Sequence, residues 1–332
     1  MLPIVGESPM LAQTVERLKG LVSPGQVFVI TNAEQREAVL DSCPELLPEQ
    51  VIGEPQGRDT AAAVGLAALL VERKEPGAAF ALLPADHVIS DGAGFRKVLA
   101  GAFAAAEQKD VLVTIGIKPD SPSTGYGYLR QGADAGKLAT LPVHQVERFV
   151  EKPNLEKAES YLQEGGYFWN AGMFVWRTDV ILAAICEHAP ELSKGLDDLS
   201  NHWTESGSIN QAMDQVYPQL EKISIDFAVM EKAKDVVMLE SAFDWDDVGE
   251  WPAIARHYPA DDMGNVFKGA GSALDASGNL TYAEPGHTIS LLGVKDLIVV
   301  QSGDATLVCH KDCAQQVKEL AQQVCQKNPD LG

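Results

Sequence analysis

The sequence predicts an α/β protein, with a doubly wound, mostly parallel sheet and a small β-rich C-terminal domain. Strand-length apolar runs alternate with helical patterns through the first half of the chain, which is typical of βαβ units with helices on both faces of a sheet. After about residue 264 the apolar runs become short, closely spaced and broken by Gly, Asp and Asn, and a helical pattern at 314–326 closes the chain. We therefore expect a sheet domain over residues 1–260 and the β-rich domain over 261–332.

The elements of the first domain follow from local patterns. Ser8 and Pro9 suit the cap and first position of a helix with apolar residues at 10, 11, 15 and 18. Apolar runs predict strands at 27–31, 51–52, 79–83 and 111–117, and the segments between them predict helices at 34–43, 60–74 and 95–107. Beyond residue 125 the pieces are longer and less regular: 146–150, 168–176 and a helical stretch at 178–188.

The second domain is expected after a turn-like stretch at 258–264. Its short strands are predicted at 265–266, 282–283, 289–291, 297–300 and 305–309. We expect exposed strands of this kind to offer a contact for a homodimer.

Composition excludes several classes of protein. The 332 residues include 26 Lys and Arg against 47 Asp and Glu, so the net charge of −21 argues against binding to nucleic acid or an anionic membrane. The five scattered cysteines indicate a reducing cytoplasm rather than a disulfide framework. No apolar run approaches the roughly 18 residues of a membrane helix, and the N-terminus lacks the features of a signal peptide. We expect a cytoplasmic protein without a membrane partner.

Two acidic segments are candidates for a magnesium site. Asp86 lies just past a predicted buried strand, where a carboxylate either caps the next element or binds a hard cation. Asp247 lies in a distant acidic cluster, 244–247, which is bracketed by aromatic and apolar residues. Two such carboxylates brought together across a cleft would hold Mg²⁺ between phosphates.

The segment 54–61 follows a predicted strand and opens a helix. Gly57 permits a close backbone approach, and the helix N-terminus offers unpaired N–H groups to an anion or a base edge. A capped helix start, with Asp59 or Thr60 as the cap, explains the same residues.

Further polar residues stand at the ends of strands or within apolar runs. Lys152 is a point charge suited to phosphate and Glu151 could accept sugar hydroxyls, although a surface ion pair is the simpler interpretation. Asn170 interrupts an aromatic run, where its amide either satisfies backbone groups or binds ligand hydroxyls. The loop that contains Gly125 and Gly127 is open to the same two interpretations.

Together these segments resemble the mannose-1-phosphate guanylyltransferases of the bacterial long-chain type, whose nucleotide-diphospho-sugar transferase fold the resemblance implies. The matching segments occur in order over essentially the whole chain: 54–61, 83–87, 122–128, 149–153, 169–174, 224–231 and 245–249. The stretch 294–316 also resembles the C-terminal appendage of the family. Nothing after it resembles the isomerase domain of bifunctional relatives.

The resemblance implies a role for each matched residue. Asp86 and Asp247 would hold Mg²⁺ on the triphosphate of GTP, and Lys152 would neutralise the phosphate of mannose 1-phosphate. Glu151 and Asn170, with the backbone at Gly125 and Gly127, would bind the mannose. The nucleotide would lie along four residues of the segment 54–61: Glu54, Gly57, Arg58 and Thr60. Asp86, Lys152 and Asp247 would act in catalysis, and the products would be GDP-mannose and pyrophosphate.

This chain departs from the family pattern at several positions. Asp59 stands where the family usually has Asn, and Asp246 and Glu250 stand where it often has Ser. In the family, a first strand and a glycine-rich loop precede the segment matched here by residues 2–7. We expect that Met1 is not the natural start, that a longer product carries the activity, and that GTP turnover by these 332 residues alone is severely impaired. Two alternatives are another hexose-1-phosphate nucleotidyltransferase and a catalytically silent relative that binds a nucleotide sugar.

Overall fold

The computed structural model describes residues 3–138, 141–249 and 251–327. The described chain divides into two compact units. Unit 1 comprises residues 8–245, and unit 2 comprises residues 3–7 together with residues from 246 onward. The domain boundary that the sequence suggests near residue 260 stays a prediction.

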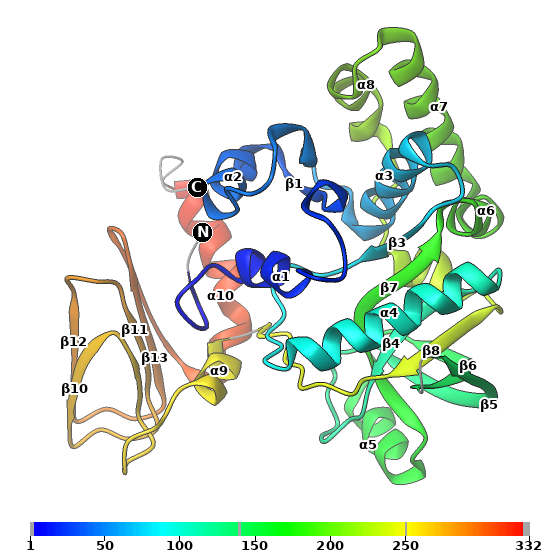
Figure 1. Ribbon diagram of the computed structural model, residues 1–332. Helices are drawn as coiled ribbons and strands as arrows, with labels where there is room; N and C mark the ends of the chain where they lie inside the picture. Colours follow the sequence, from blue (N-terminus) through cyan, green and yellow to red (C-terminus); the bar gives the residue numbers. More distant parts are fainter. Residues whose placement is uncertain (1–2, 139–140, 250, 328–332) are drawn as a thin grey trace. The chain divides into compact units, whose positions relative to one another are not determined.

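Unit 1 is a layered α/β structure (Figure 1). Its strands are β1 (Val29–Asn32), β2 (Val51–Glu54), β3 (Ala79–Leu82), β4 (Leu112–Ile117), β5 (Tyr128–Leu138), β6 (Leu141–Val150), β7 (Tyr167–Arg177) and β8 (Val236–Glu240). Its α-helices are α1 (Met10–Arg17), α2 (Arg36–Ser42), α3 (Asp59–Lys74), α4 (Gly92–Gln108), α5 (Leu155–Glu164), α6 (Thr178–His188), α7 (Pro190–Ser206) and α8 (Ile209–Val216). A π-helical turn, Asp226–Met230, precedes β8.

The central sheet of unit 1 has six strands in the order β3-β7-β4-β8-β6-β5. The strands β3, β4, β5 and β8 run in one direction, whereas β6 and β7 run in the opposite direction. Neighbours β4 and β8 are parallel, while β7 is inserted antiparallel between β3 and β4. Among the described residues, β1 and β2 form a separate parallel pair.

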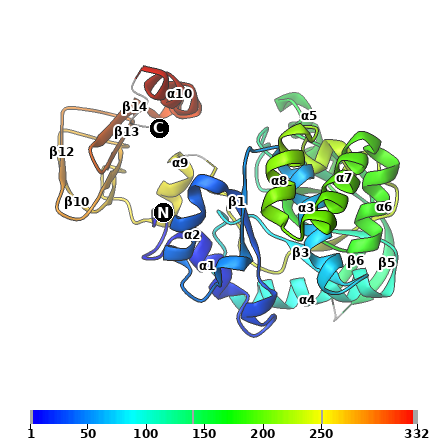
Figure 2. The ribbon, with the colours of Figure 1, turned by 90° about the horizontal axis from the view of Figure 1, so that it is seen from above.

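Helices cover both faces of the central sheet (Figures 1 and 2). Along β8, Val236 and Met238 pack into the apolar core shared with α3, α6, α7 and α8. Val237 and Leu239 point to the other face, into the core shared with α4 and α5. Because successive side chains of a strand point to opposite faces, a strand buried on both sides carries an unbroken apolar run.

Unit 2 is a short stack of parallel strands closed by a helix. Its elements are α9 (Trp251–Ile254), β9 (Val266–Lys268), β10 (Ala270–Leu274), β11 (Leu280–Ala283), β12 (Thr288–Leu292), β13 (Leu297–Ser302), β14 (Ala305–His310) and α10 (Val317–Lys327). The strands β9, β11 and β13 are neighbours in parallel register, as are β10 and β12. The chain therefore coils, with β9, β11 and β13 in one sheet and β10 and β12 in another, and β14 then turns back antiparallel to β13.

Stacked asparagine side chains hold the corners of this coil. Asn265 and Asn279 are buried, and Asn279 donates a hydrogen bond of 2.8 Å from Nδ2 to Asn265 Oδ1. The Oδ1 atom of Asn279 in turn accepts the backbone N–H of Leu297 at 2.9 Å. The Asn residues that break the short strands in the sequence thus satisfy buried backbone groups from one turn to the next.

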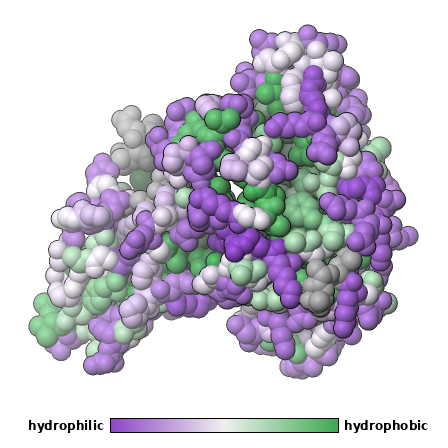
Figure 3. Space-filling view, in the orientation of Figure 1, coloured by the Kyte–Doolittle hydropathy of each residue, from purple (hydrophilic) through white to green (hydrophobic). Residues whose placement is uncertain are grey.

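The predicted fold class is confirmed: an α/β unit is followed by a small β appendage and a closing helix. The predicted helix cap at Ser8 is wrong, because α1 begins at Met10 with Pro9 before it. The sequence patterns also missed β5, β8, β10, α5, α7 and α8. In the described part of the chain, no helix is long and apolar enough to cross a membrane, and the visible face is mostly hydrophilic (Figure 3).

Candidate functional site

The register of three strands brings Gly127, Glu151 and Asn170 together. Tyr128, at the start of β5, pairs with Val150 at the end of β6 and with Trp169 in β7. The residues next to these pairs in the chain, Gly127, Glu151 and Asn170, are therefore neighbours. The backbone N–H of Asn170 donates a hydrogen bond of 2.8 Å to the carbonyl of Gly127. Three residues assigned to the sugar from separate motifs meet at one edge of the sheet.

A side chain at Gly127 would force the Glu151 carboxylate to move. A Cβ atom there would stand 2.5 Å from Glu151 Oε2 and 3.3 Å from Asn170 Cβ. The corresponding position at Gly125 is open, with Ser123 Oγ the nearest atom at 3.6 Å. Of the two glycines in the loop, only Gly127 packs directly against the Glu151 carboxylate.

The amide of Asn170 is held at both ends. Its Oδ1 accepts from the Thr114 hydroxyl and from the Gly172 backbone N–H, each at 3.1 Å, and its Nδ2 donates to Asp226 Oδ1 at 3.1 Å. Asn170 therefore satisfies a bulged backbone, one of its two predicted roles. An amide nitrogen carries two hydrogens, so the second N–H could donate to a ligand hydroxyl.

Glu151 and Lys152 form an ion pair of unequal exposure. Lys152 Nζ lies 2.9 Å from Glu151 Oε1, with the lysine side chain 62% exposed and the glutamate only 10% exposed. The hydrogen bond to Glu151, together with the charges of Asp226 and Asp59, raises the pKa of Lys152. The Lys152 ammonium is therefore charged and exposed to solvent, whereas the Glu151 carboxylate that it contacts is largely buried.

Asp226 is a member of this cluster that the sequence patterns did not assign. Burial and the nearby charge of Glu151 raise the pKa of Asp226 to about 6, even though Asn170 and Lys152 favour the charged form. One signal could have identified it, because it is an acid within the otherwise apolar run from Ile225 to Met230. Carboxyl groups with such displaced pKa values concentrate at functional sites.

The predicted nucleotide segment lies at the start of α3. The Thr60 hydroxyl oxygen accepts a hydrogen bond of 2.9 Å from the backbone N–H of Ile225. The backbone N–H of Ala61 donates a hydrogen bond of 3.1 Å to the carbonyl of Ile223. Asp59 has a positive φ of 66° and accepts from Thr60 N at 2.7 Å. Gly57 borders open space, and the buried Nε of Arg58 has no hydrogen-bond partner among the described residues.

Glu54 ends β2 beneath this loop. The fully buried Tyr217 donates its phenolic hydrogen to Glu54 Oε1. Burial raises the pKa of Glu54, and the hydrogen bond from Tyr217 opposes that shift. Tyr217 was not assigned from the sequence, because nothing local to it indicates a partner 163 positions away.

One stretch of chain connects the nucleotide and sugar residues. We call residues 223–231 the bridging segment. It contacts the start of α3 through Ile225, Asn170 through Asp226, and the β6 end through Glu231, whose Oε1 accepts the Glu151 backbone N–H at 2.9 Å. The two predicted subsites are therefore parts of one hydrogen-bonded assembly.

Asp86 is exposed on the loop after β3. Its neighbour His87 is buried and accepts at Nδ1 a hydrogen bond of 3.1 Å from Trp245 Nε1. Trp245 also packs edge-on against Tyr126, with ring centroids 5.2 Å apart. An aromatic cluster thus links the Asp86 loop to the loop of Gly125 and Gly127.

Asp247 belongs to unit 2, so the structure describes it and Asp86 in separate units. Beside it, Asp246 accepts two hydrogen bonds from Arg256 at 2.8 and 2.9 Å and one of 2.9 Å involving His257. Burial raises the pKa of Asp246, but these hydrogen bonds outweigh that effect and lower it. Across the described residues there is no cluster of three or more His, Cys, Asp or Glu side chains placed to hold a metal.

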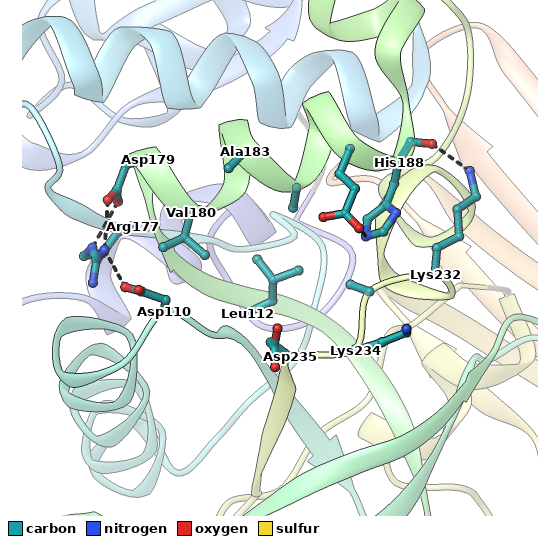
Figure 4. Close-up of a pocket in the computed structure, with 13 residues that line it drawn as sticks. Asp110, Leu112, Arg177, Asp179, Val180, Ala183, His188, Lys232, Lys234 and Asp235 are labelled. Atoms are coloured by element: carbon teal, nitrogen blue, oxygen red, sulfur yellow. Dashed lines mark hydrogen bonds and ion pairs between the residues drawn. The ribbon is translucent and has the colours of Figure 1, made fainter.

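A cavity of about 360 Å³ lies at the N-terminal ends of β4 and β8, away from the site residues described above (Figure 4). None of the predicted site residues lines it. Arg177 there is neutralised by Asp110 and Asp179 at 2.7 and 2.8 Å, and Lys232 donates to the carbonyl of His188 at 3.0 Å. The cavity is separate from the site described above.

Comparison with known families shows that the chain is a nucleotidyl transferase. The nucleotidyl transferase family matches residues 1–262, and the MannoseP isomerase/GMP-like beta-helix domain matches residues 271–324. The chain belongs to the mannose-1-phosphate guanylyltransferase family of enzymes, as the sequence resemblance predicted.

Individual relatives cover nearly the whole chain. Xanthan biosynthesis protein XanB of Xanthomonas campestris pv. campestris (strain B100) is 37% identical over 325 residues, which cover 97% of this chain and 68% of that protein. Mannose-1-phosphate guanylyltransferase of Escherichia coli (strain K12) is 35% identical over 323 residues, covering 96% and 67%.

A solved structure shows the same arrangement. The crystal structure described as mannose-1-phosphate geranyltransferase from Thermus thermophilus matches with a TM-score of 0.82 at 36% identity, covering 95% of this chain and 89% of that one. Mannose-6-phosphate isomerase from Helicobacter pylori matches with a TM-score of 0.61 at 25% identity, covering 74% and 93%.

Proposed function

We propose that this enzyme transfers the guanylyl group of GTP to mannose 1-phosphate, giving GDP-mannose and pyrophosphate. The observation that carries the proposal is the convergence of Glu151, Lys152 and Asn170 around Gly127. Relatives named mannose-1-phosphate guanylyltransferase support the choice of substrates.

The sugar subsite offers one donor and one acceptor beside a lysine. Glu151 Oε2 faces Gly127 and could accept a mannose hydroxyl, while the second N–H of Asn170 could donate to a neighbouring hydroxyl. Lys152 projects outward from Glu151 and would neutralise the sugar phosphate. Such a set orients the sugar and holds its phosphate for attack.

The nucleotide subsite uses the backbone and two side chains. Gly57 leaves room for the close approach of a phosphate, and the Arg58 guanidinium supplies a positive charge at the start of α3. Glu54, held by Tyr217, could accept the N–H groups of guanine.

The reaction requires positioning more than proton transfer. A phosphate oxygen of mannose 1-phosphate forms a bond to the α-phosphorus of GTP, while the bond from that phosphorus to the bridging oxygen breaks. Pyrophosphate leaves with the electron pair of the broken bond. Fixed cations such as Lys152 stabilise the charge that gathers at the reacting phosphates.

Magnesium suits the predicted ligands by donor chemistry. Both predicted ligands, Asp86 and Asp247, are carboxylates, and Asp86 is exposed just beyond a strand end. Mg²⁺ in such enzymes binds one or two carboxylates together with substrate phosphates, so Asp86 and Asp247 would hold it. When bound, it would neutralise charge on the triphosphate.

Turnover and product binding test the proposal together. Pyrophosphate release is measured with GTP, ATP, UTP or dTTP, each paired with mannose 1-phosphate or glucose 1-phosphate, in the presence of MgCl₂. Calorimetry measures binding of GDP-mannose and of UDP-glucose. We expect GTP with mannose 1-phosphate to give the highest kcat/KM, by about tenfold or more, and GDP-mannose to bind more tightly. Preference for another pair, or neither turnover nor GDP-mannose binding, would overturn the proposal.

Cytoplasmic location, the homodimer and the absence of nucleic-acid partners stay predictions.

A further inference from the structure

We propose that Asp226 is a positioning residue, which orients the Asn170 amide so that Asn170 can bind a hydroxyl of the mannose. This inference rests on the proposed function, because it concerns the sugar subsite of the same reaction.

The first support is that Asn170 has a fixed orientation. Its oxygen faces two donors, the Thr114 hydroxyl and the Gly172 N–H, and its nitrogen faces the Asp226 carboxylate. Reversing the amide would set its oxygen against the carboxylate and its nitrogen against the Gly172 N–H. The Asp226 carboxylate, which only accepts, and the Gly172 N–H, which only donates, therefore select the orientation that leaves an N–H for the ligand.

The second support is that Asp226 is itself held from both sides of the site. The bridging segment is tied to Thr60 one residue before Asp226, and to the backbone of Glu151 five residues after it. Asp226 thus has a defined place relative to the predicted nucleotide and sugar subsites. A carboxylate on a loose loop could not orient Asn170 in this way.

The third support is the charge distribution around Asp226. The carboxylates of Glu151 and Asp226 both lie near the ammonium of Lys152, which is also influenced by the charge of Asp59. Burying an acid next to another acid costs stability, so its presence calls for a role other than stabilising the fold. Orientation of a ligand-binding amide provides that role.

The experiment measures how much the sugar contributes to binding. Calorimetry gives the Kd of GDP and of GDP-mannose for the wild-type enzyme, and the ratio of the two reports the sugar contacts. We expect Asp226→Ala to reduce the preference for GDP-mannose by about fivefold to tenfold, with the affinity for GDP changed by less than about twofold. Asp226→Asn keeps an acceptor oxygen and should retain most of the preference.

A second variant tests the hydrogen bond at the oxygen atom of the same Asn170 amide. Thr114→Val removes a hydroxyl that lies 3.1 Å from Asn170 Oδ1, and should also reduce the preference for GDP-mannose. Asp235→Ala, which removes an exposed acid next to β8 and away from the site, is the matched control and should change neither Kd. Thermal unfolding of each variant verifies that it is folded.

The outcomes separate the two proposals. If the wild-type enzyme does not bind GDP-mannose, the proposed function fails and this inference fails with it. If the wild type binds GDP-mannose and Asp226→Ala keeps the wild-type ratio, Asp226 does not position Asn170. An equal loss of affinity for GDP and GDP-mannose would assign Asp226 to the fold and likewise overturn the inference.

Discussion

Asn170 donates a hydrogen bond of 3.1 Å to Asp226, which lies 56 positions further along the chain. The contact joins the middle of β7 to the bridging segment, and through Thr60 to the start of α3. The residues that we assign to the sugar and those that we assign to the nucleotide are therefore parts of one assembly. Its contacts can be tested one at a time.

Gly127 and Gly125 are expected to respond differently to the same substitution. In Gly127→Ala the new Cβ would meet Glu151 Oε2 at 2.5 Å and displace that carboxylate. We expect the KM for mannose 1-phosphate to rise about tenfold or more, since misplaced binding groups weaken orientation of the substrate. Steady-state kinetics at saturating GTP measures this effect.

Gly125→Ala is the matched control. Its Cβ would have only Ser123 Oγ within 4 Å, at 3.6 Å, so we expect a KM within about twofold of wild type. Equal effects at the two positions would contradict the assignment of the close contact to Gly127.

At pH values above its pKa, ionised Asp226 is expected to lower the free energy of unfolding. Its folded pKa of about 6 exceeds the ordinary value of 3.8, so the folded protein binds this proton more tightly than the unfolded chain does. The stabilisation that comes from this tighter proton binding is fully present below the unfolded pKa and is lost as pH rises through the folded pKa. Asp226→Asn should therefore be more stable than wild type by about 1 to 3 kcal/mol at about pH 8.

Urea unfolding at about pH 8 and about pH 5 tests this sign, because the advantage of Asp226→Asn should shrink as the pH falls. Glu151 and Lys152, the charged groups that act on Asp226, are present in both wild type and variant. A pH-independent difference in the free energy of unfolding would show that Asp226 titrates normally.

Tyr217→Phe is expected to weaken both the fold and the nucleotide subsite. The substitution removes only the hydroxyl that donates to the half-buried Glu54 and keeps the buried ring. An unsatisfied buried acceptor costs about 1–3 kcal/mol, so the free energy of unfolding should fall by that amount. The KM for GTP should rise while the KM for mannose 1-phosphate stays close to wild type.

Tyr161→Phe serves as the comparison, because this buried tyrosine packs by stacking its ring on Tyr167, with centroids 4.1 Å apart. It should leave the KM for GTP unchanged. If Tyr217→Phe also leaves that KM unchanged, Glu54 does not contact the nucleotide.

Asp86 is expected to set the magnesium dependence of the reaction. Asp86→Ala removes an exposed carboxylate, and we expect the Mg²⁺ concentration for half-maximal rate to rise about tenfold, with a large loss of maximal rate. Magnesium titrations of pyrophosphate release measure both quantities.

The neighbouring acid Asp91 provides the control for this experiment. Its Oδ1 accepts the Gly94 N–H at 2.9 Å and so caps α4. Asp91→Ala should cost about 1 kcal/mol of stability without altering the magnesium titration. A magnesium dependence that moves with Asp91 but not with Asp86 would remove Asp86 from the metal site.

Much of the site was predictable because its residues carry local signals. Glu151 follows a predicted strand and Asn170 interrupts an apolar run, and polar groups at such places commonly bind ligands, whereas Gly127 was assigned through the family resemblance. Tyr217 was not assigned, because its partner lies 163 positions away and no local pattern indicates it. Asp226 was not assigned either, although it is an acid within an apolar run, because its partner Asn170 lies 56 positions away. The side-chain contacts of the bridging segment are visible only once the chain is folded.

The sequence by itself determined the α/β class, the β-rich appendage and the closing helix, because apolar periodicity and turn residues act over a few positions at a time. Only the tertiary structure decided that β7 enters antiparallel between β3 and β4, and that β9, β11 and β13 stack as successive turns of a coil. Strand neighbours are chosen by burial and backbone hydrogen bonding across long separations, which a local pattern does not record. The same long-range pairing sets Gly127 against Glu151 and Asn170, and so brings the proposed sugar subsite together from three separate segments.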